Sequence, residues 1–143
     1  MKFPKDVRTG AVAGLGTALV EAAYSVVLKV LASTTGFEVL APLPEMSLGM
    51  VARYSFAALG LSAPVWVVLG ALAGFVYHRA GDRLPGEDRL ERSAATAGGM
   101  WLFFVAVVLA LGLETVYIGT FLLSSAAYGV LFWRLKERFS TDE

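Results

Sequence analysis

Cysteine is absent from this chain of 143 residues, which excludes disulfide bonds, thiolate metal sites and thiol catalysis. Asparagine and glutamine are absent as well, and together with short loops this composition is typical of a thermophilic source. Histidine occurs once, so the chain cannot supply two histidine ligands to a haem. No His, Asp or Glu spacing typical of a metal site is found. We therefore predict no cofactor and no bound metal.

Charge is scarce. Charged residues make up 17% of the chain, against about 25% in ordinary soluble domains. Hydrophobic residues make up 57%, and the mean hydropathy is +0.65. A soluble fold of this size could not bury so much apolar surface, so we predict an all-α integral membrane protein in contact with the lipid bilayer. The formal net charge is zero, which gives no reason to expect nucleic acid as a partner.

The apolar runs predict four membrane-spanning helices in a single polytopic domain covering residues 1–143. The run at 94–133 is too long for one crossing, and it contains Glu114 beside Gly112, so we expect a hairpin there. The spans are expected at about 10–32, 57–79, 94–112 and 116–134.

Basic residues predict the topology. Ten of the twelve Lys and Arg residues fall in three groups, at 2–8, 79–92 and 134–138. The positive-inside rule places all three groups in the cytoplasm, with both termini, on a multi-pass protein of the cytoplasmic membrane. Residues 46–79 must then cross only once. We therefore expect an outer loop or collar at 33–56, with a short interfacial helical segment near 46–56, and a cytoplasmic loop at 80–93. Pro64 is expected to kink the second span or begin its regular part.

The first span carries a narrow polar row. Its members recur at a spacing of four, with Tyr24 at the border: Thr17, Glu21, Ser25 and Lys29. Lipid cannot satisfy such groups, so the row must face protein or water. Glu21 lies near mid-depth, where a carboxylate is a functional hypothesis by default. It is predicted either to respond to protons or cations in a transport pathway, or to hold the bundle together, for instance through Arg53 or hydroxyls of the last helix.

Other polar residues allow two interpretations. Lys29 and Arg53 are expected to reach the outer headgroups, or to form an outer charged vestibule with Glu38, Glu45 or Glu114. The last helix presents hydroxyls close to one face, at Tyr117, Thr120, Ser124 and Tyr128. Such a row lines a polar pathway or forms hydrogen bonds between helices.

Small residues recur at a spacing of four in "GAVAG" at 10–14, "GALAG" at 70–74 and "AATAGG" at 94–99. This pattern lets helix backbones approach closely. We expect these Gly-rich faces to pack within the chain, between copies in a homo-oligomer, or against other membrane subunits.

The stretch "ALVEAAYSVVLK" resembles the first helix of the small multidrug resistance transporters. The similarity lies in a mid-helix Glu, a small hydroxyl four residues later and a Lys eight residues later, and "TTGF" follows as it does there. The resemblance covers about 20 of the 143 residues. The outer loop is longer here, and the family's central Trp-containing helix is not found. The resemblance implies that Glu21 is a proton- or cation-exchange carboxylate.

Two functions follow from these residues. The first is a small transport-type protein that moves a small solute or ion coupled to protons or cations, with Glu21 as the responsive group and oligomerisation completing the pathway. The second is a non-catalytic accessory or scaffold subunit of a larger membrane complex. No nucleophile–base set and no phosphate-binding or metallohydrolase motif is present, so we do not predict an enzyme.

Overall fold

The computed structural model describes residues 3–35, 47–113 and 116–141, and four long helices contain most of them. They are α1 (Lys5–Thr35), α2 (Leu48–Ala80), α3 (Arg89–Ala110) and α4 (Val116–Thr141), with a 3-10 turn η1 (Gly81–Arg83) after α2. The described residues contain no strand. Each of the four helices is long and apolar enough to cross a membrane. The all-helical, multi-pass class that the composition predicts is therefore supported.

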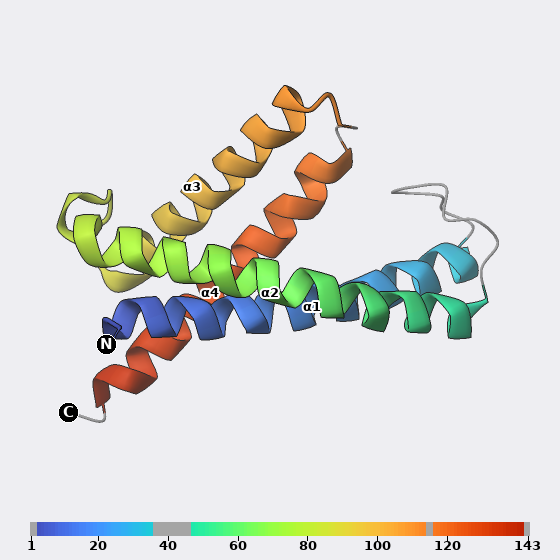
Figure 1. Cartoon of the computed structure of the whole chain (residues 1–143), viewed down its shortest axis with the longest axis horizontal. Coiled ribbons are helices and arrows are strands. Elements are labelled where there is room, and N and C mark those ends of the chain that lie inside the picture. The colour runs from blue at the N-terminus through green and yellow to red at the C-terminus, as the bar shows by residue number, and fades with distance from the viewer. Residues whose placement is uncertain (1–2, 36–46, 114–115, 142–143) are drawn as a thin grey trace.

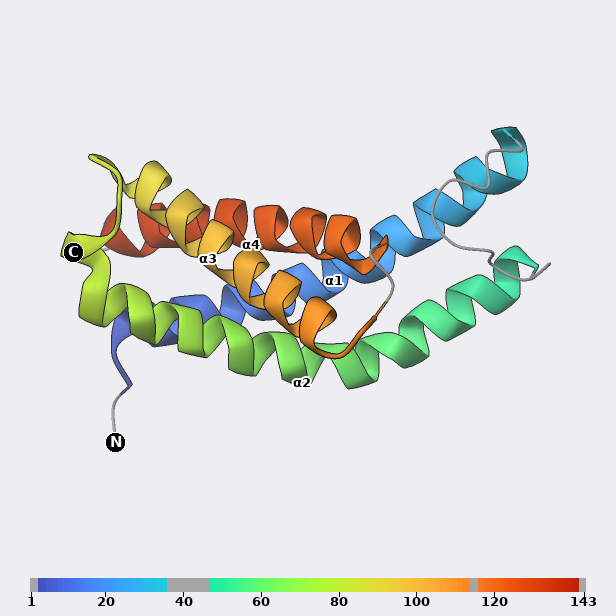
Figure 2. The ribbon, with the colours of Figure 1, turned by 90° about the horizontal axis from the view of Figure 1, so that it is seen from above.

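The helices form two antiparallel pairs. α1 and α2 lie side by side along the long axis, and the α3–α4 hairpin crosses them obliquely (Figure 1). α4 packs on α1, whereas α2 and α3 barely touch. Both termini lie at one end of the molecule (Figure 2). The two pairs therefore meet mainly along the α1–α4 contact.

Local sequence signals explain the helix ends. Ser47 caps α2 by accepting a hydrogen bond from the Met50 N–H (3.3 Å), and Asp88 caps α3 by accepting one from the Glu91 N–H (2.8 Å). After α3, Gly112 takes a positive φ of 64°, which glycine adopts without a steric penalty. The chain turns here, as expected for the 94–133 run, and Glu114 lies outside the described residues.

The expected separate segment near 46–56 is not found in its described part. Residues 48–56 belong to the same continuous helix as 57–80, because Ser47 caps that helix and no proline occurs in it before Pro64. Pro64 removes one backbone donor but does not end α2. Figure 2 shows the first turns of α2 inclined to the rest of the helix, as a proline bend would produce. With 33 residues, α2 is about 50 Å long.

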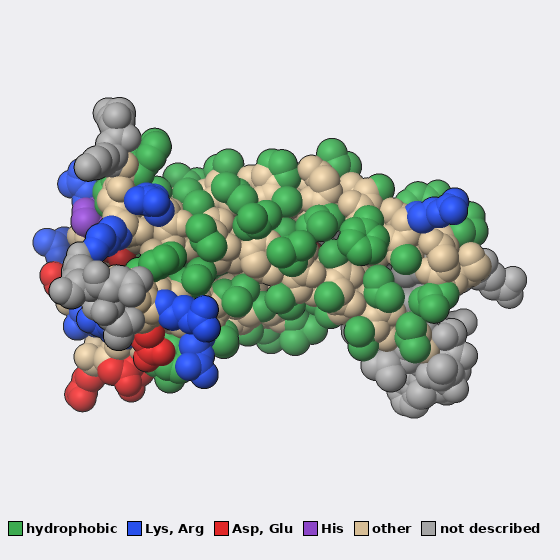
Figure 3. Space-filling view, turned by 90° about the horizontal axis from the view of Figure 1, so that it is seen from below, with side chains coloured by type: hydrophobic (Ala, Val, Ile, Leu, Met, Phe, Trp, Pro, Cys, Tyr) green, Lys and Arg blue, Asp and Glu red, His purple; other side chains and the backbone are tan. Residues whose placement is uncertain are grey.

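Glycines bring α1 and α2 into backbone contact. A Cβ added at Gly10 would collide with the carbonyl oxygen of Gly70, and one added at Gly14 would collide with that of Trp66. Lys, Arg, Asp and Glu side chains gather at the end of the molecule where α1 begins, which we call the charged end (Figure 3). There, a Cβ on Gly74 would meet the Asp6 carbonyl. The "GAVAG" and "GALAG" faces thus pack against each other within the chain, and this contact occupies them.

Two layers of side chains fill the interior. Near the charged end, Tyr128 and Phe132 of α4 stack beside Tyr77 of α2. Farther along the bundle, Trp66 of α2 packs against Phe104 of α3, which stacks on Phe121 of α4 with ring centroids 4.4 Å apart. This second aromatic layer lies next to Glu21.

Candidate functional site around Glu21

The Glu21 carboxylate points between helices and reaches α2. Its Oε2 accepts a hydrogen bond of 2.6 Å from the indole Nε1–H of Trp66. Trp66 is only 4% exposed, and Glu21 is half-buried. The glycine contacts that bring α1 against α2 allow the indole to reach Glu21, because the Trp66 backbone touches α1 at Gly14. Among the described side chains, no basic group pairs with this carboxylate.

The neighbours of Glu21 in the polar row bond to their own helix. The Thr17 hydroxyl is fully buried and donates to the Ala13 carbonyl at 2.9 Å. The Ser25 hydroxyl donates to the Glu21 carbonyl at 2.8 Å. Hydroxyls that return to the carbonyl four residues earlier are satisfied locally in a helix. Within the row, Glu21 is thus the member seen to bond another helix.

Tyr24 connects the same region of α1 to α4. Its hydroxyl lies against Ser124 and Thr120, and its ring is half-buried. The Ser124 hydroxyl is close to Tyr24 but makes no hydrogen bond of ordinary geometry with a described residue. Glu21 and Tyr24 together therefore link α1 to both of its neighbours, α2 and α4.

The remaining predicted residues lie elsewhere. Tyr128 is fully buried and donates a hydrogen bond of 3.0 Å to the Gly70 carbonyl, in the layer nearer the charged end. Arg53 is exposed on α2, thirteen residues or about 20 Å along the helix from Trp66, so it does not reach Glu21. Lys29 and Tyr117 lie in α1 and α4, and their side chains are outside the described part of the structure, as are Glu38, Glu45 and Glu114.

The role of Trp66 was not predicted from the sequence. A tryptophan in a membrane protein is usually expected in the interfacial belts. Trp66 instead occupies the middle of an apolar run, between Val65 and Val67, and this central position was the available signal. It supplies the neutral donor for Glu21 and, through Phe104, joins the site to α3.

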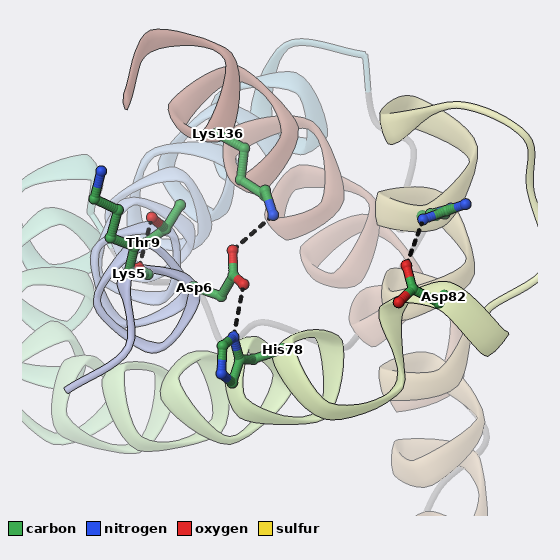
Figure 4. Close-up of polar contacts among 7 residues, drawn as sticks. Lys5, Asp6, Thr9, His78, Asp82 and Lys136 are labelled. Atoms are coloured by element: carbon green, nitrogen blue, oxygen red, sulfur yellow. Dashed lines mark hydrogen bonds and ion pairs between the residues drawn. The ribbon is translucent and has the colours of Figure 1, made fainter. Parts of the chain in front are cut away.

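A second polar cluster, also not predicted from the sequence, joins three helices at the charged end. Asp6 of α1 receives a hydrogen bond of 2.6 Å from the Lys136 ammonium of α4 and lies 3.2 Å from Nδ1 of His78 of α2 (Figure 4). The ammonium also lies 4.1 Å from the centre of the Tyr77 ring. Figure 3 shows Lys, Arg, Asp and Glu gathered at this end, with hydrophobic side chains along the middle of the molecule. The only available signal was an acid, Asp6, within an otherwise basic N-terminal group.

No group of acids and histidines that could hold a metal ion occurs among the described residues. Comparison of the chain with protein-family models, with curated proteins and with solved structures gives no match. The similarity to the first helix of small multidrug resistance transporters thus remains a local one.

Proposed function

We propose that this chain is a small membrane transporter driven by protons or cations, in which Glu21 takes up and releases the proton or cation. One observation carries the proposal. A half-buried carboxylate near the middle of α1, inside the candidate span Lys5–Val27, has a neutral indole N–H as its described side-chain partner. A charge at such a depth costs a few kcal/mol or more in a membrane. One neutral donor does not cancel that charge, so a proton or an incoming cation is needed to do so.

The neighbours of Glu21 give it a way to influence the bundle. Its carboxylate is bonded to α2 through Trp66, and Tyr24, one turn later on α1, faces α4. A change in the charge of Glu21 alters the strength of the Trp66 bond, since hydrogen bonds to charged groups are stronger than those to neutral ones. Uptake and release at Glu21 can thus be coupled to how α1 packs on its two neighbours.

Oligomerisation is part of the proposal. α2 and α3 barely touch, so the four helices do not form a closed ring around Glu21. A homo-oligomer would supply the helices that complete a pathway beside this residue.

Glu21→Gln tests the proposal in proteoliposomes. We expect proton flux under an imposed pH gradient, reported by a trapped pH-sensitive dye, and this flux should fall at least tenfold in the variant, with loss of its pH dependence. Glu87→Gln, at an exposed carboxylate in the loop before α3, is the matched control and should keep the flux of the unmodified chain. An unchanged rate and pH dependence in Glu21→Gln would remove Glu21 from the mechanism.

The alternative is an accessory subunit of a membrane complex. It is favoured by the unequal lengths of the α1–α2 and α3–α4 helix pairs. α2 has 33 residues and α3 has 22, so α1–α2 extend beyond the α3–α4 hairpin (Figure 1). On α2, the part before Pro64 exposes large apolar side chains, including Phe56 and Leu61. Gentle purification separates the alternatives: stoichiometric foreign subunits favour the accessory role, and a single polypeptide favours transport.

A further inference from the structure

The outer face of the α3–α4 hairpin carries an apolar groove of about 330 Å³. Small residues form much of its surface, and larger apolar side chains border it. Its lining includes Ala94, Gly98, Ala126, Leu90, Trp101 and Leu122. A Cβ added at Gly98 would meet no atom within 4 Å, so the groove is open at this point.

The groove has the length of one bilayer leaflet. It runs from Leu90, in the first turn of α3, to Trp101, eleven residues farther on, which is about 16 Å of helix. The hydrocarbon core of a bilayer is about 30 Å thick, so each leaflet contributes about half of that. Because α3 begins at the charged end, the groove starts at the level of the basic residues and ends near the middle of α3.

The cross-section of the groove suits a hydrocarbon chain better than a helix. Its volume of about 330 Å³ is spread over about 16 Å of helix, so the groove is narrow as well as long. A helix, by contrast, is about 10 Å across. A partner helix would therefore sit above the groove without filling it.

A positively charged side chain lies at one end of the groove. Arg134 lies one turn beyond Val130 on α4, on the face that lines the groove, and its side chain is 67% exposed. Its guanidinium rests over the Trp133 ring at 4.6 Å, and its nearest acid, Glu137, is 4.0 Å away at the limit of an ion pair. A pair this long and exposed leaves the guanidinium accessible to another anion.

We propose that this groove binds one acyl chain of an anionic phospholipid, with its phosphate at Arg134. The proposal rests on the chain residing in a bilayer, and it is independent of transport through Glu21. Apolar lining, leaflet length and a cation at the headgroup level together match that lipid. Basic residues at the membrane surface attract anionic headgroups with an energy that corresponds to about fivefold in affinity for each residue.

Brominated lipids test the proposal through Trp101, which lines the groove. The purified chain is reconstituted in unlabelled phosphatidylcholine with either dibromo-phosphatidylglycerol or dibromo-phosphatidylcholine. Bromine quenches tryptophan fluorescence, and the part of the quenching that disappears in Trp101→Phe is assigned to Trp101. We expect the phosphatidylglycerol to quench Trp101 at about fivefold lower mole fraction, and Arg134→Gln to abolish this preference.

A leucine substitution at Gly98, which has no neighbouring atoms, provides a second test of the proposal. Gly98→Leu fills the groove and should reduce the quenching of Trp101 by both lipids. Gly60→Leu, at a glycine on α2 that is equally free of neighbours, is the matched control and should change nothing. Far-UV circular dichroism confirms that each variant folds. Equal quenching by the two lipids, a preference that survives Arg134→Gln, or a Trp101 shielded from both lipids by a second copy would overturn the proposal.

Discussion

The α1–α2 pair and the α3–α4 pair are both antiparallel, but different contacts hold them together. α1 and α2 touch backbone to backbone, with Gly10 on Gly70 as one example. α3 and α4 are joined largely by side chains, including the stacked rings of Phe104 and Phe121. Small residues at a spacing of four occur in both pairs, yet Gly98 faces an open groove while Gly70 faces another backbone. The pattern thus indicates where a close approach is possible, and the rotation of each helix decides whether it happens.

Valine substitutions at a tightly packed glycine, Gly70, and at an open one, Gly98, should give the largest difference in unfolding free energy. In Gly70→Val the new Cβ collides with the Gly10 carbonyl oxygen, and the backbone cannot move aside as a flexible side chain would. We expect a loss of about 3 kcal/mol or more in unfolding free energy, because overpacking against rigid atoms forces helices apart. Gly98→Val should change stability by no more than about 0.5 kcal/mol, as for other substitutions that meet no neighbour. Unfolding in mixed micelles by a denaturing detergent, followed by far-UV circular dichroism, measures both.

Equal losses in the two variants would show that the α1–α2 contact is no tighter than the rest of the bundle. Gly70→Ala refines the result, since its single methyl group meets the same carbonyl with less bulk elsewhere.

The two tryptophans that bridge helices offer a second contrast. Trp66 donates to the Glu21 carboxylate across α1–α2, and Trp101 donates to the Ile118 carbonyl across α3–α4 at 3.0 Å. Hydrogen bonds to charged groups contribute about 1.5–3 kcal/mol, and neutral ones about 1 kcal/mol. At a pH at which Glu21 is ionised, we therefore expect Trp66→Phe to lower the unfolding free energy by about 2 kcal/mol, and Trp101→Phe by about half as much.

A double-mutant cycle separates the hydrogen bond from the lost ring volume. Trp66→Phe is compared in the unmodified chain and in Glu21→Gln. If the bond to a charged carboxylate matters, the two substitutions should be coupled by about 1 kcal/mol. Additive losses would mean that Trp66 acts only through packing against Phe104.

Much of the fold could be predicted because it depends on local or periodic signals. Apolar runs longer than about 18 residues indicate candidate spans, and the length of the 94–133 run required a turn, which is seen at Gly112. The start of α2 was missed because hydropathy and charge do not distinguish an interfacial segment from the first turns of a long helix. Ser47, whose side chain caps α2, was the local signal that would have placed it.

The contacts of the candidate site could be predicted only in part. The polar row on α1 made Glu21 a candidate, since periodicity shows which residues share a face. The partner could not be predicted, because Trp66 lies 45 residues away and the rotation of α2 about its axis is set by glycine contacts. The Asp6–Lys136 contact joins residues 130 apart, and no local pattern indicates such a pair.

The cluster at the charged end should give the smallest contrast, between a partly buried ion pair and an exposed one. Asp6→Asn removes the charge that faces Lys136, in a pair whose side chains are 20% and 18% exposed. The substitution also removes an acid from the first turn of α1, where a negative charge interacts favourably with the positive end of the helix dipole. We expect a loss of about 1 kcal/mol in unfolding free energy at low salt, and a smaller loss at 1 M salt, where the Debye length is about 3 Å. Asp82→Asn, in a 3.5 Å pair with Arg92 whose carboxylate is fully exposed, should have no measurable effect. A loss in Asp6→Asn that is independent of salt would mean that Asp6 joins α1 to α4 through hydrogen-bond geometry, and that its charge contributes little.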